Sequence, residues 1–314
     1  MKRSPLLAPI VALVMLLIST SASAFCWFNC NYTKTQYPIV LAHGLLGYKE
    51  LAGVDYFYGI VDSLRDGGAT VYVTEVSPMN SSVVRGEQLI TQLDEIRAIR
   101  GQPSLKFNLV AHSQGGLDAR YVAGVRPDLV ASLTTVGSPH QGGDPSLSAL
   151  AALGDTAIID AMGDLIGLLY DFLGGSAQPI DPAATFALFD PANIAAFSAD
   201  FPAGMPTTQC GQGAAVTQTT AGPIRNYSWT GNKVFTNALD PGDGLLVLLS
   251  SAYSSASDGL VPVCSAHFGT VLRNNYWMNH LDEVNQLLGI TSVFESDPKS
   301  VFRAHANRLK NAGL

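Results

Sequence analysis

The sequence predicts an α/β fold in which helices cover both faces of a mostly parallel central sheet. Short, fully apolar runs alternate with segments of helical spacing, which is typical of buried parallel strands joined by crossover helices. The chain has 314 residues, enough for one large domain with a sizeable core or for two smaller domains. No internal repeat or low-complexity linker divides it, so we take residues 25–314 as a single domain.

The expected elements follow in order along the first half of the chain. TQYPIVLAHG predicts a strand over residues 38–42, and GATVYVTEV predicts a second strand. SSVVRGEQLITQLDEIRAIRG carries a helix that Gly101 closes. FNLVA is the third strand, followed by a helix through Tyr121, and SLTTVGSP is the fourth strand. Because such crossovers are right-handed, we expect the carboxyl ends of the strands at one edge, where loops can build a site.

Residues 1–24 have the composition of a secretory signal peptide. Lys2 and Arg3 begin the segment, an apolar run follows, and its final ASA offers a cleavage site after Ala24. The alternative is a membrane anchor, for which the apolar run is short. No later segment combines the length and the freedom from charge of a membrane-spanning helix. We therefore expect a soluble, secreted mature chain.

Charge and composition narrow the function classes. Removal of the signal peptide takes away two cations and no acid, so the formal net charge changes from −7 to −9. Mild acidity without a basic cluster argues against a nucleic-acid partner. Charged residues make up 14% of the chain, whereas an average soluble domain has about 25%. A secreted protein this apolar suggests work at a lipid or polymer surface.

Four cysteines, Cys26, Cys30, Cys210 and Cys264, suit an oxidising compartment and allow three disulfide pairings. Cys26 and Cys30 lie close together in CWFNC, which leaves Cys210 and Cys264 as the natural remaining pair. A metal site is the weaker interpretation, because no histidine lies near the early pair. The C-x-x-x-C spacing also argues against a redox-active pair.

Residues 155–175 predict an amphipathic helix with a strongly apolar face. Three aspartates lie on one side, and apolar residues recur on the other side at helical spacing: Ile158, Met162, Leu165, Leu169 and Phe172. The simpler interpretation is a helix packed permanently on the core. The acids exclude a membrane span, and glycines at both ends would allow a hinge, so the alternative is a mobile lid.

Ser113 lies in FNLVAHSQGGLDARYVAG, which predicts a strand, a sharp turn and a helix. Such an elbow lifts a serine hydroxyl above the sheet edge, and the residues two before and two after it must be small. Here these residues are Ala111 and Gly115. The usual pattern has glycine at both positions, so this is an alanine variant and a weaker match.

A serine nucleophile needs a base, and the chain has six histidines. Five of them have an ordinary local interpretation. The ring of His112 should point away from the serine, and His43 should shape the loop in which it lies. His140 and His267 have polar roles in loops, and His305 lies on a solvated helix face. His280 is left as the base. Asp258, between Ser113 and His280, would give the Ser, Asp, His order of α/β hydrolases, although spacing alone does not prefer it to Asp240 or Asp243.

The charge that develops on an attacked carbonyl oxygen needs hydrogen-bond donors already aimed at it. We expect one donor to be the backbone N–H of Gln114, directly after the nucleophile. The other should come from the loop HGLLG after the first strand, where Leu45 follows His43 and Gly44. An HG pair at a strand end, followed some seventy residues later by a serine elbow, is more specific than either motif alone.

The chain resembles the secreted true lipases of the Pseudomonas and Burkholderia type over nearly the whole mature length. The resemblance is densest in YPIVLAHGLLG, GVDYFYGI, VYVTEVS, RGEQL, RYVAGVRPDL, VGSPHQG, NNYWMNHLDEVNQLLGI and HANRLKNA. It implies the α/β-hydrolase fold with a helical lid. Two features depart from the family: alanine at position 111, where many members have glycine, and four cysteines where we expect only the later pair to have counterparts.

The resemblance also implies residue roles. Ser113 corresponds to the nucleophile, Asp258 to the orienting acid and His280 to the base, with Leu45 and Gln114 as oxyanion donors. Cys210 and Cys264 correspond to the single disulfide of the family. One structural calcium ion would be held by two carboxylates and two backbone carbonyls: Asp240, Asp282, Gln286 and Ile290. Because Asp282 follows the base by two residues, this ion would pin the loop of His280. The alternative is that both acids are turn and helix-start residues.

The resulting functional hypothesis is a secreted triacylglycerol lipase that acts on glycerol esters at oil–water interfaces through an acyl-enzyme. The resemblance further implies a membrane-tethered, lipase-specific foldase in the periplasm, and we expect a monomeric enzyme. One rival is a carboxylesterase for short soluble esters, against which the long apolar lid segment counts. Another rival is a non-catalytic lipid-binding protein on the same scaffold, which the presence of all three triad residues disfavours.

Overall fold

The computed structural model describes residues 31–51, 53–141, 178–251 and 253–314. The expected signal peptide, the lid segment 155–175 and the pair Cys26 and Cys30 lie outside these residues. In the described part of the chain, no helix has both the length and the apolar character needed to cross a bilayer.

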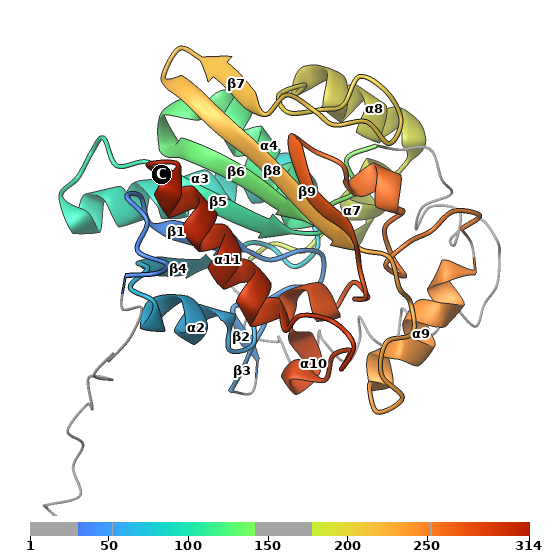
Figure 1. Ribbon diagram of the computed structural model, residues 1–314. Coiled ribbons are helices and arrows are strands. Elements are labelled where there is room, and N and C mark those ends of the chain that lie inside the picture. The colour runs from blue at the N-terminus through green and yellow to red at the C-terminus, as the bar shows by residue number, and fades with distance from the viewer. Residues whose placement is uncertain (1–30, 52, 142–177, 252) are drawn as a thin grey trace, which may run out of the picture.

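A mostly parallel sheet forms the centre of the molecule (Figure 1). Its strands run in the order β4, β1, β5, β6, β8, with β7 and β9 both paired to β8. Among the described residues every paired couple in this sheet is parallel except β7 with β8. The strand bounds are β1 Ile39–Ala42, β4 Val71–Thr74, β5 Phe107–His112, β6 Val130–Val136, β7 Val216–Thr219, β8 Gly222–Gly231 and β9 Thr270–Tyr276.

The predicted fold class is confirmed, and the four expected strands correspond to β1, β4, β5 and β6. Strands β1, β5 and β6 are buried along their whole length, which explains why none of them alternates between apolar and charged residues. A separate small hairpin joins β2 (Glu50–Leu51) and β3 (Val54–Asp55).

Helices cover both faces of the sheet. α2 (Ile60–Asp66) and α11 (Pro298–Asn311) pack on one face, and α3 (Ser82–Arg100) and α4 (Gln114–Val125) pack on the other (Figure 1). Each pair of helices forms a buried apolar cluster with the strands that it covers. This arrangement leaves the carboxyl ends of β1, β5 and β6 at one edge of the sheet.

Local signals explain where α3 begins and ends. The Ser81 side chain accepts a hydrogen bond from the Val84 N–H, and Gly101 ends the helix with a φ of 62°. Ser81 is a common residue type at the start of a helix and Gly101 at its end, and the sequence predicts the second. α4 runs to Val125, four residues beyond the predicted Tyr121.

The remaining helices lie mainly around the carboxyl edge of the sheet. They are α7 (Pro182–Leu188), α8 (Pro191–Asp200), α9 (Pro241–Ser250) and the short α10 (Gln286–Gly289), with 3₁₀ turns at Pro127–Leu129, Val263–Ala266 and Asp282–Val284. Asp181, Asp190 and Asp240 each cap the helix that follows, and proline occupies its first turn in all three.

Two sequence expectations about single residues are decided by the fold. The disulfide between Cys210 and Cys264 is present, with Cα atoms 4.4 Å apart. The expectation that His305 lies on a solvated helix face is wrong. Its side chain is buried against the sheet, and Nε2 lies 2.8 Å from the Thr134 hydroxyl of β6. The charged neighbours in HANRLK concealed that this position faces inward.

Candidate active site

Ser113 occupies the turn between β5 and α4 in a strained backbone conformation, with φ 55° and ψ −131°. A non-glycine residue in such a region costs on the order of 1–3 kcal/mol and persists only where its surroundings enforce it. A Cβ on Gly115 would lie 2.6 Å from the His43 carbonyl oxygen, and a Cβ on Gly44 would lie 2.5 Å from the Ser113 Cβ. The turn at Ser113 therefore needs glycine at position 115 and at position 44 of the neighbouring loop, whereas the buried alanine at position 111 fits.

His280 and Asp258 form a buried, directional pair. Nδ1 of His280 lies 2.7 Å from Oδ2 of Asp258, and the backbone N–H of His280 donates to the Asp258 carbonyl at 2.8 Å. The other carboxylate oxygen accepts from the N–H groups of Leu260 and Val261 at 2.9 and 2.7 Å. A carboxylate held by two backbone donors fixes the imidazole with Nδ1 protonated, which leaves Nε2 available as a base.

Ser113 and His280 line the same cavity, which has a volume of about 480 Å³. Asp258 lies behind His280 and is fully buried. The rest of the lining is mainly apolar, from the loop after β1 and from α9: Leu45, Leu46, Leu51, Leu245, Leu246 and Leu249. A cavity of this size and character accommodates an acyl chain better than a charged ligand.

The two predicted oxyanion donors lie next to this serine. Gln114 is the first residue of α4, so its N–H has no carbonyl partner within the helix. Leu45 lies three residues after β1 and lines the cavity with Ser113. Leu45 thus lines the cavity itself, while Gln114 follows Ser113 directly in the chain.

Arg85 holds the loop that carries Leu45. Its guanidinium is fully buried, donates to the carbonyls of His43 and Gly44 at 2.9 and 3.2 Å, and pairs with Asp118 at 2.8 Å. Burial raises the pKa of Asp118 although Arg85 opposes this shift. Because an isolated buried charge is very unfavourable, the pair and its carbonyl partners depend on one another.

Glu283 is a second buried carboxyl group near the triad residues. One of its oxygens accepts from the Gly231 N–H at 2.5 Å and from the Thr230 hydroxyl at 3.0 Å. The other oxygen has no hydrogen-bond partner. Burial, followed by the proximity of Asp258, raises the pKa of Glu283 well above its ordinary value. This favours the neutral form of Glu283.

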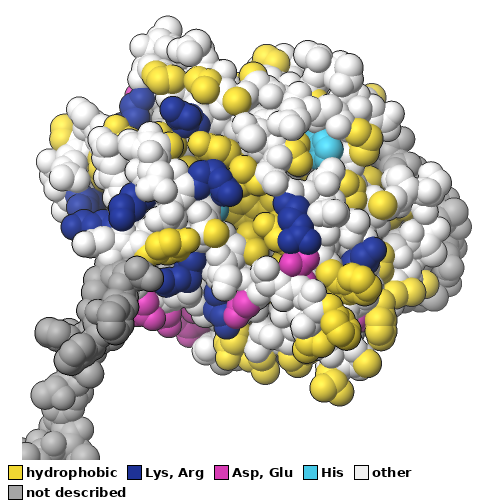
Figure 2. Space-filling model, in the orientation of Figure 1, with side chains coloured by type: hydrophobic (Ala, Val, Ile, Leu, Met, Phe, Trp, Pro, Cys, Tyr) yellow, Lys and Arg dark blue, Asp and Glu magenta, His cyan; other side chains and the backbone are white. Residues whose placement is uncertain are grey.

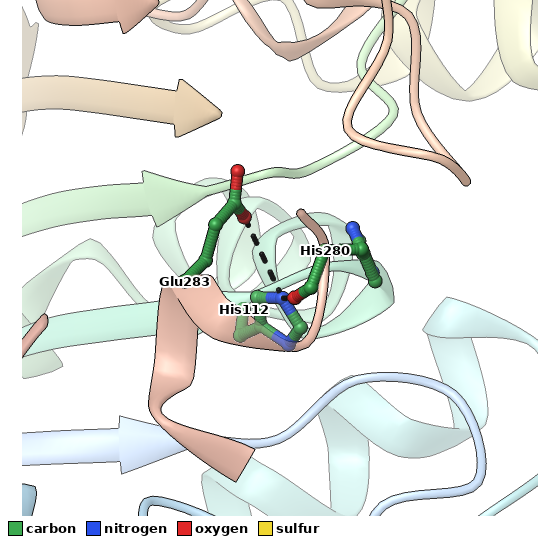
Figure 3. A group of neighbouring side chains, drawn as sticks. All are labelled: His112, His280 and Glu283. Atoms are coloured by element: carbon green, nitrogen blue, oxygen red, sulfur yellow. Dashed lines mark hydrogen bonds and ion pairs between the residues drawn. The ribbon is translucent and has the colours of Figure 1, made fainter. Parts of the chain in front are cut away.

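His112, His280 and Glu283 place three potential metal-ligand atoms within 4.8 Å of one another (Figure 3). The hydrogen bonds argue against a metal at this point. Nε2 of His112 lies 3.0 Å from the His280 carbonyl oxygen, which can only accept, so this nitrogen carries the proton. Nδ1 of His280 is taken by Asp258.

Two of the four residues predicted to bind calcium, Asp240 and Asp282, lie close enough for their charges to interact. Asp240 caps α9 through one oxygen, while its second oxygen is buried without a partner. Asp282 likewise keeps one buried oxygen without a partner. Burial is the largest cause that raises the pKa of Asp282 to about 7, and the nearby charges of Asp240 and Asp243 add to it. Two buried carboxylates with free oxygens form a fitting donor set for a hard cation.

The backbone around the other two predicted ligands is unusual. Asn285, Leu287 and Leu288 all have positive φ values, of 59°, 52° and 62°. Such conformations are unfavourable for residues other than glycine, so the turn carrying Gln286 and Ile290 is held by something outside itself.

Asp243, an open alternative for the triad acid, instead accepts from the N–H groups of Thr236 and Asn237 and does not contact His280.

His43 and His140 are buried structural groups. His43 accepts from the Val76 N–H and donates through Nδ1 to the Gly44 carbonyl, so it shapes the oxyanion loop as predicted. Burial lowers the pKa of His43 to about 3, and nearby Arg85 adds to this shift. His140 contacts Arg120 and Thr135, and its buried ring has a pKa well below the ordinary value.

Sequence reasoning missed three residues of this site: Arg85, Glu283 and Tyr56. Arg85 lies in the RGEQL segment, which was noted only as part of a resemblance. Glu283 follows a predicted calcium ligand, and an acid in a charged-looking loop gives no sign of burial. Tyr56 precedes an apolar helix and reads as an ordinary core aromatic. The contacts of all three span distant parts of the chain, which spacing does not show.

Residues 37–158 match the family model of the α/β hydrolase fold. A triacylglycerol lipase of Vibrio cholerae serotype O1 is 45% identical, with 97% of this chain and 99% of that protein aligned. A Burkholderia plantarii triacylglycerol lipase is 37% identical over 90% of this chain and 88% of its own length. A Pseudomonas fragi triacylglycerol lipase is 33% identical over 90% and 98%.

Solved structures support the fold. The mature form of the Bacillus licheniformis lipase BlEst2 superposes with a TM-score of 0.57 at 18% identity, covering 87% of this chain and 92% of that one. The Staphylococcus hyicus lipase gives the same TM-score at 16% identity, covering 89% and 97%.

Proposed function

Because the chain belongs to the triacylglycerol lipases and is a serine ester hydrolase of the α/β-hydrolase fold, we propose that it hydrolyses triacylglycerols. The observation that carries this proposal is the meeting of a strained serine with a carboxylate-held histidine in one apolar cavity. The apolar lining favours long acyl chains over short soluble esters, which makes a carboxylesterase the second candidate.

In the proposed reaction, Ser113 Oγ attacks the ester carbonyl carbon while Nε2 of His280 takes the hydroxyl proton. Asp258 stabilises the imidazolium that results. The N–H groups of Leu45 and Gln114 stabilise the negative charge on the carbonyl oxygen. The carbon–oxygen bond to the glycerol then breaks, and His280 passes its proton to the leaving alcohol. The products of this half-reaction are a diacylglycerol and an acyl-enzyme.

Deacylation repeats the path with water as the nucleophile. His280 accepts a proton from water, the hydroxide attacks the acyl carbon, and the oxyanion donors act again. The bond to Ser113 Oγ breaks as His280 returns the proton, which frees the fatty acid and regenerates the enzyme. The neutral Glu283 needs no part in either proton transfer.

Calcium binding belongs to the same proposal. The carboxylates of Asp240 and Asp282, with the carbonyls of Gln286 and Ile290, would hold one ion, which supplies positive charge to a buried acidic cluster. Support comes from the two unpartnered carboxylate oxygens and the strained turn between the carbonyls. Asp282 follows His280 by two residues, so ordering this loop keeps the base in place.

Work at a lipid surface and export complete the proposal. Hydrophobic side chains gather over α9 and α10 beside the cavity, and Val247, Leu248 and Leu288 are exposed there (Figure 2). This supports contact with an oil surface. The lid over residues 155–175, the signal peptide, the foldase partner and the monomeric state remain predictions that derive from the sequence and the resemblance.

The test compares wild type with Ser113→Ala, both folded in the presence of calcium. Hydrolysis is followed on an emulsified long-chain triacylglycerol and on a dissolved short-chain ester through its solubility limit. A lipase gives a rise in wild-type rate when droplets appear and no such rise in the mutant. Activity on the dissolved ester alone would favour the carboxylesterase, and a fully active mutant would exclude Ser113 as nucleophile.

A further inference from the structure

Tyr56 and His112 connect the three loops that carry the reacting groups. The Tyr56 hydroxyl accepts from the Gly44 N–H at 3.2 Å and lies 2.7 Å from Nδ1 of His112. Nε2 of the same ring lies 3.0 Å from the carbonyl oxygen of His280. Gly44 precedes the oxyanion donor Leu45, and His112 precedes the nucleophile, so one chain of hydrogen bonds reaches all three.

The direction of each hydrogen bond follows from its partners. The His280 carbonyl can only accept, so His112 must carry its proton on Nε2. Its Nδ1 is then a bare acceptor and must receive the Tyr56 hydroxyl proton. The Tyr56 oxygen in turn accepts from Gly44. For a neutral ring no other arrangement satisfies all three contacts, so the tautomer of a neutral His112 is fixed.

The ring of His112 also remains neutral throughout. It is buried, and the rings of His112 and His280 lie with centroids 4.5 Å apart at 40°. Burial and the neighbouring His280 lower the pKa of His112 well below its ordinary value. A neutral ring does not repel His280 when that residue becomes positively charged during the reaction. Glu283, 3.6 Å from Nε2, and His43 are further titratable groups close to the ring.

We propose that Tyr56 and His112 are positioning residues, which hold the backbone of His280 in register with the serine elbow and the oxyanion loop. This inference rests on the proposed function of Ser113 and His280. Asp258 fixes the His280 backbone N–H and Nδ1 from one side. His112 fixes the carbonyl from the other side, so the base is held at both polar backbone groups.

Positioning predicts an effect on turnover rather than on substrate binding. Tyr56→Phe removes only the hydroxyl and with it both of its hydrogen bonds, to Gly44 and to His112, so kcat should fall roughly tenfold with KM little changed. The amide nitrogen of glutamine reaches the place of Nε2, whereas that of asparagine reaches the place of Nδ1. His112→Gln should therefore keep kcat within about threefold of wild type, while His112→Asn should lose at least about tenfold.

Nitrogen NMR of the histidine rings tests the hydrogen-bond chain independently of activity. In wild type, His112 should show the Nε2–H tautomer and should not titrate between pH 5 and pH 8. Tyr56→Phe should change the Nδ1 shift of His112. Tyr72→Phe is the matched control, because its hydroxyl only meets Arg100 at the surface, 3.2 Å away. Unfolding curves for every variant establish that each is folded.

The outcomes separate this inference from the proposed function. An Nδ1–H tautomer in wild type, or His112→Asn with wild-type kcat, would overturn the positioning role while Ser113 could still be the nucleophile. Equal loss in the glutamine and asparagine variants would also overturn it, since it would show a purely steric need for the ring. An active Ser113→Ala would instead refute the proposed function and leave the NMR result readable.

Discussion

Nδ1 of His280 lies 2.7 Å from Oδ2 of Asp258, and the carbonyl of that aspartate accepts the backbone N–H of the same histidine. His280 thus binds Asp258 through both its side chain and its backbone. This double contact fixes the ring orientation before substrate arrives. Asp258, rather than the equally buried Glu283, is the carboxyl group that contacts the ring of the base.

Asp258→Asn and Glu283→Gln form a matched pair that tests this division of roles. Asparagine cannot stabilise the imidazolium and favours the wrong tautomer, so kcat should fall by roughly 10⁴-fold. Glutamine replaces a neutral acid with a neutral amide, so kcat should fall by less than about tenfold. Turnover of a dissolved ester measures both. Equal losses would mean that the two carboxyl groups share the role.

Arg85→Met should destabilise the protein strongly. It leaves Asp118 buried without its partner, and breaking a buried ion pair in this way costs about 3–5 kcal/mol. Adding Asp118→Leu removes the stranded charge, so the double variant should recover part of the lost unfolding free energy. Urea denaturation measures all three proteins. A double variant no more stable than Arg85→Met would contradict the pairing.

Calcium removal should lower the melting temperature and release the loop that carries His280. With the ion at a hundredfold excess over its dissociation constant, binding stabilises the folded state by about 2.7 kcal/mol. In a chain of this size this corresponds to a change in Tm of roughly 4–5 °C. Asp282→Asn should abolish the response to a chelator, whereas Asp62→Asn on the surface of α2 should keep it. A wild type indifferent to the chelator would exclude the site.

Acid should destabilise the fold below pH 6.5 through its buried histidines. Burial lowers the pKa of His305 to about 3, with nearby Arg308 adding to this shift. The unfolded state, with an ordinary pKa near 6.5, therefore binds more protons, and stability falls as pH drops from 6.5 towards 3. Each such histidine contributes about 1.4 kcal/mol per pH unit. His305→Gln should flatten the slope of unfolding free energy against pH by that amount between pH 6 and pH 5. An unchanged slope would contradict a neutral, buried His305.

Sequence reasoning was sufficient where a residue acts through its chain neighbours. Strand runs such as FNLVA are buried on both faces, so their composition alone predicts them. Ser113 was found because the elbow constrains the sizes of adjacent residues, and Gly101 because helix ends have local signals. Residues that act across the fold were not found. Arg85 donates hydrogen bonds to two carbonyls that lie 42 and 41 positions before it, and the Tyr56 hydroxyl contacts His112, 56 positions after it.

The burial of charged and polar side chains was the other property that the sequence did not predict. His305 and Glu283 stand among polar neighbours in the sequence, yet both face inward because their segments pack on the sheet. Periodicity predicts which face of an element is apolar. It gives no sign of a polar side chain that is buried because a distant strand supplies its hydrogen-bond partner, as Thr134 does for His305.

The most direct test of the central claim is covalent labelling of the wild-type protein with a fluorophosphonate, followed by peptide mass spectrometry. An activated serine reacts quickly with this reagent, whereas an ordinary serine does not. The account predicts one adduct, on Ser113, with slow labelling in Asp258→Asn and none in Ser113→Ala. Rapid labelling of a different serine, or no labelling of a folded wild type, would contradict it.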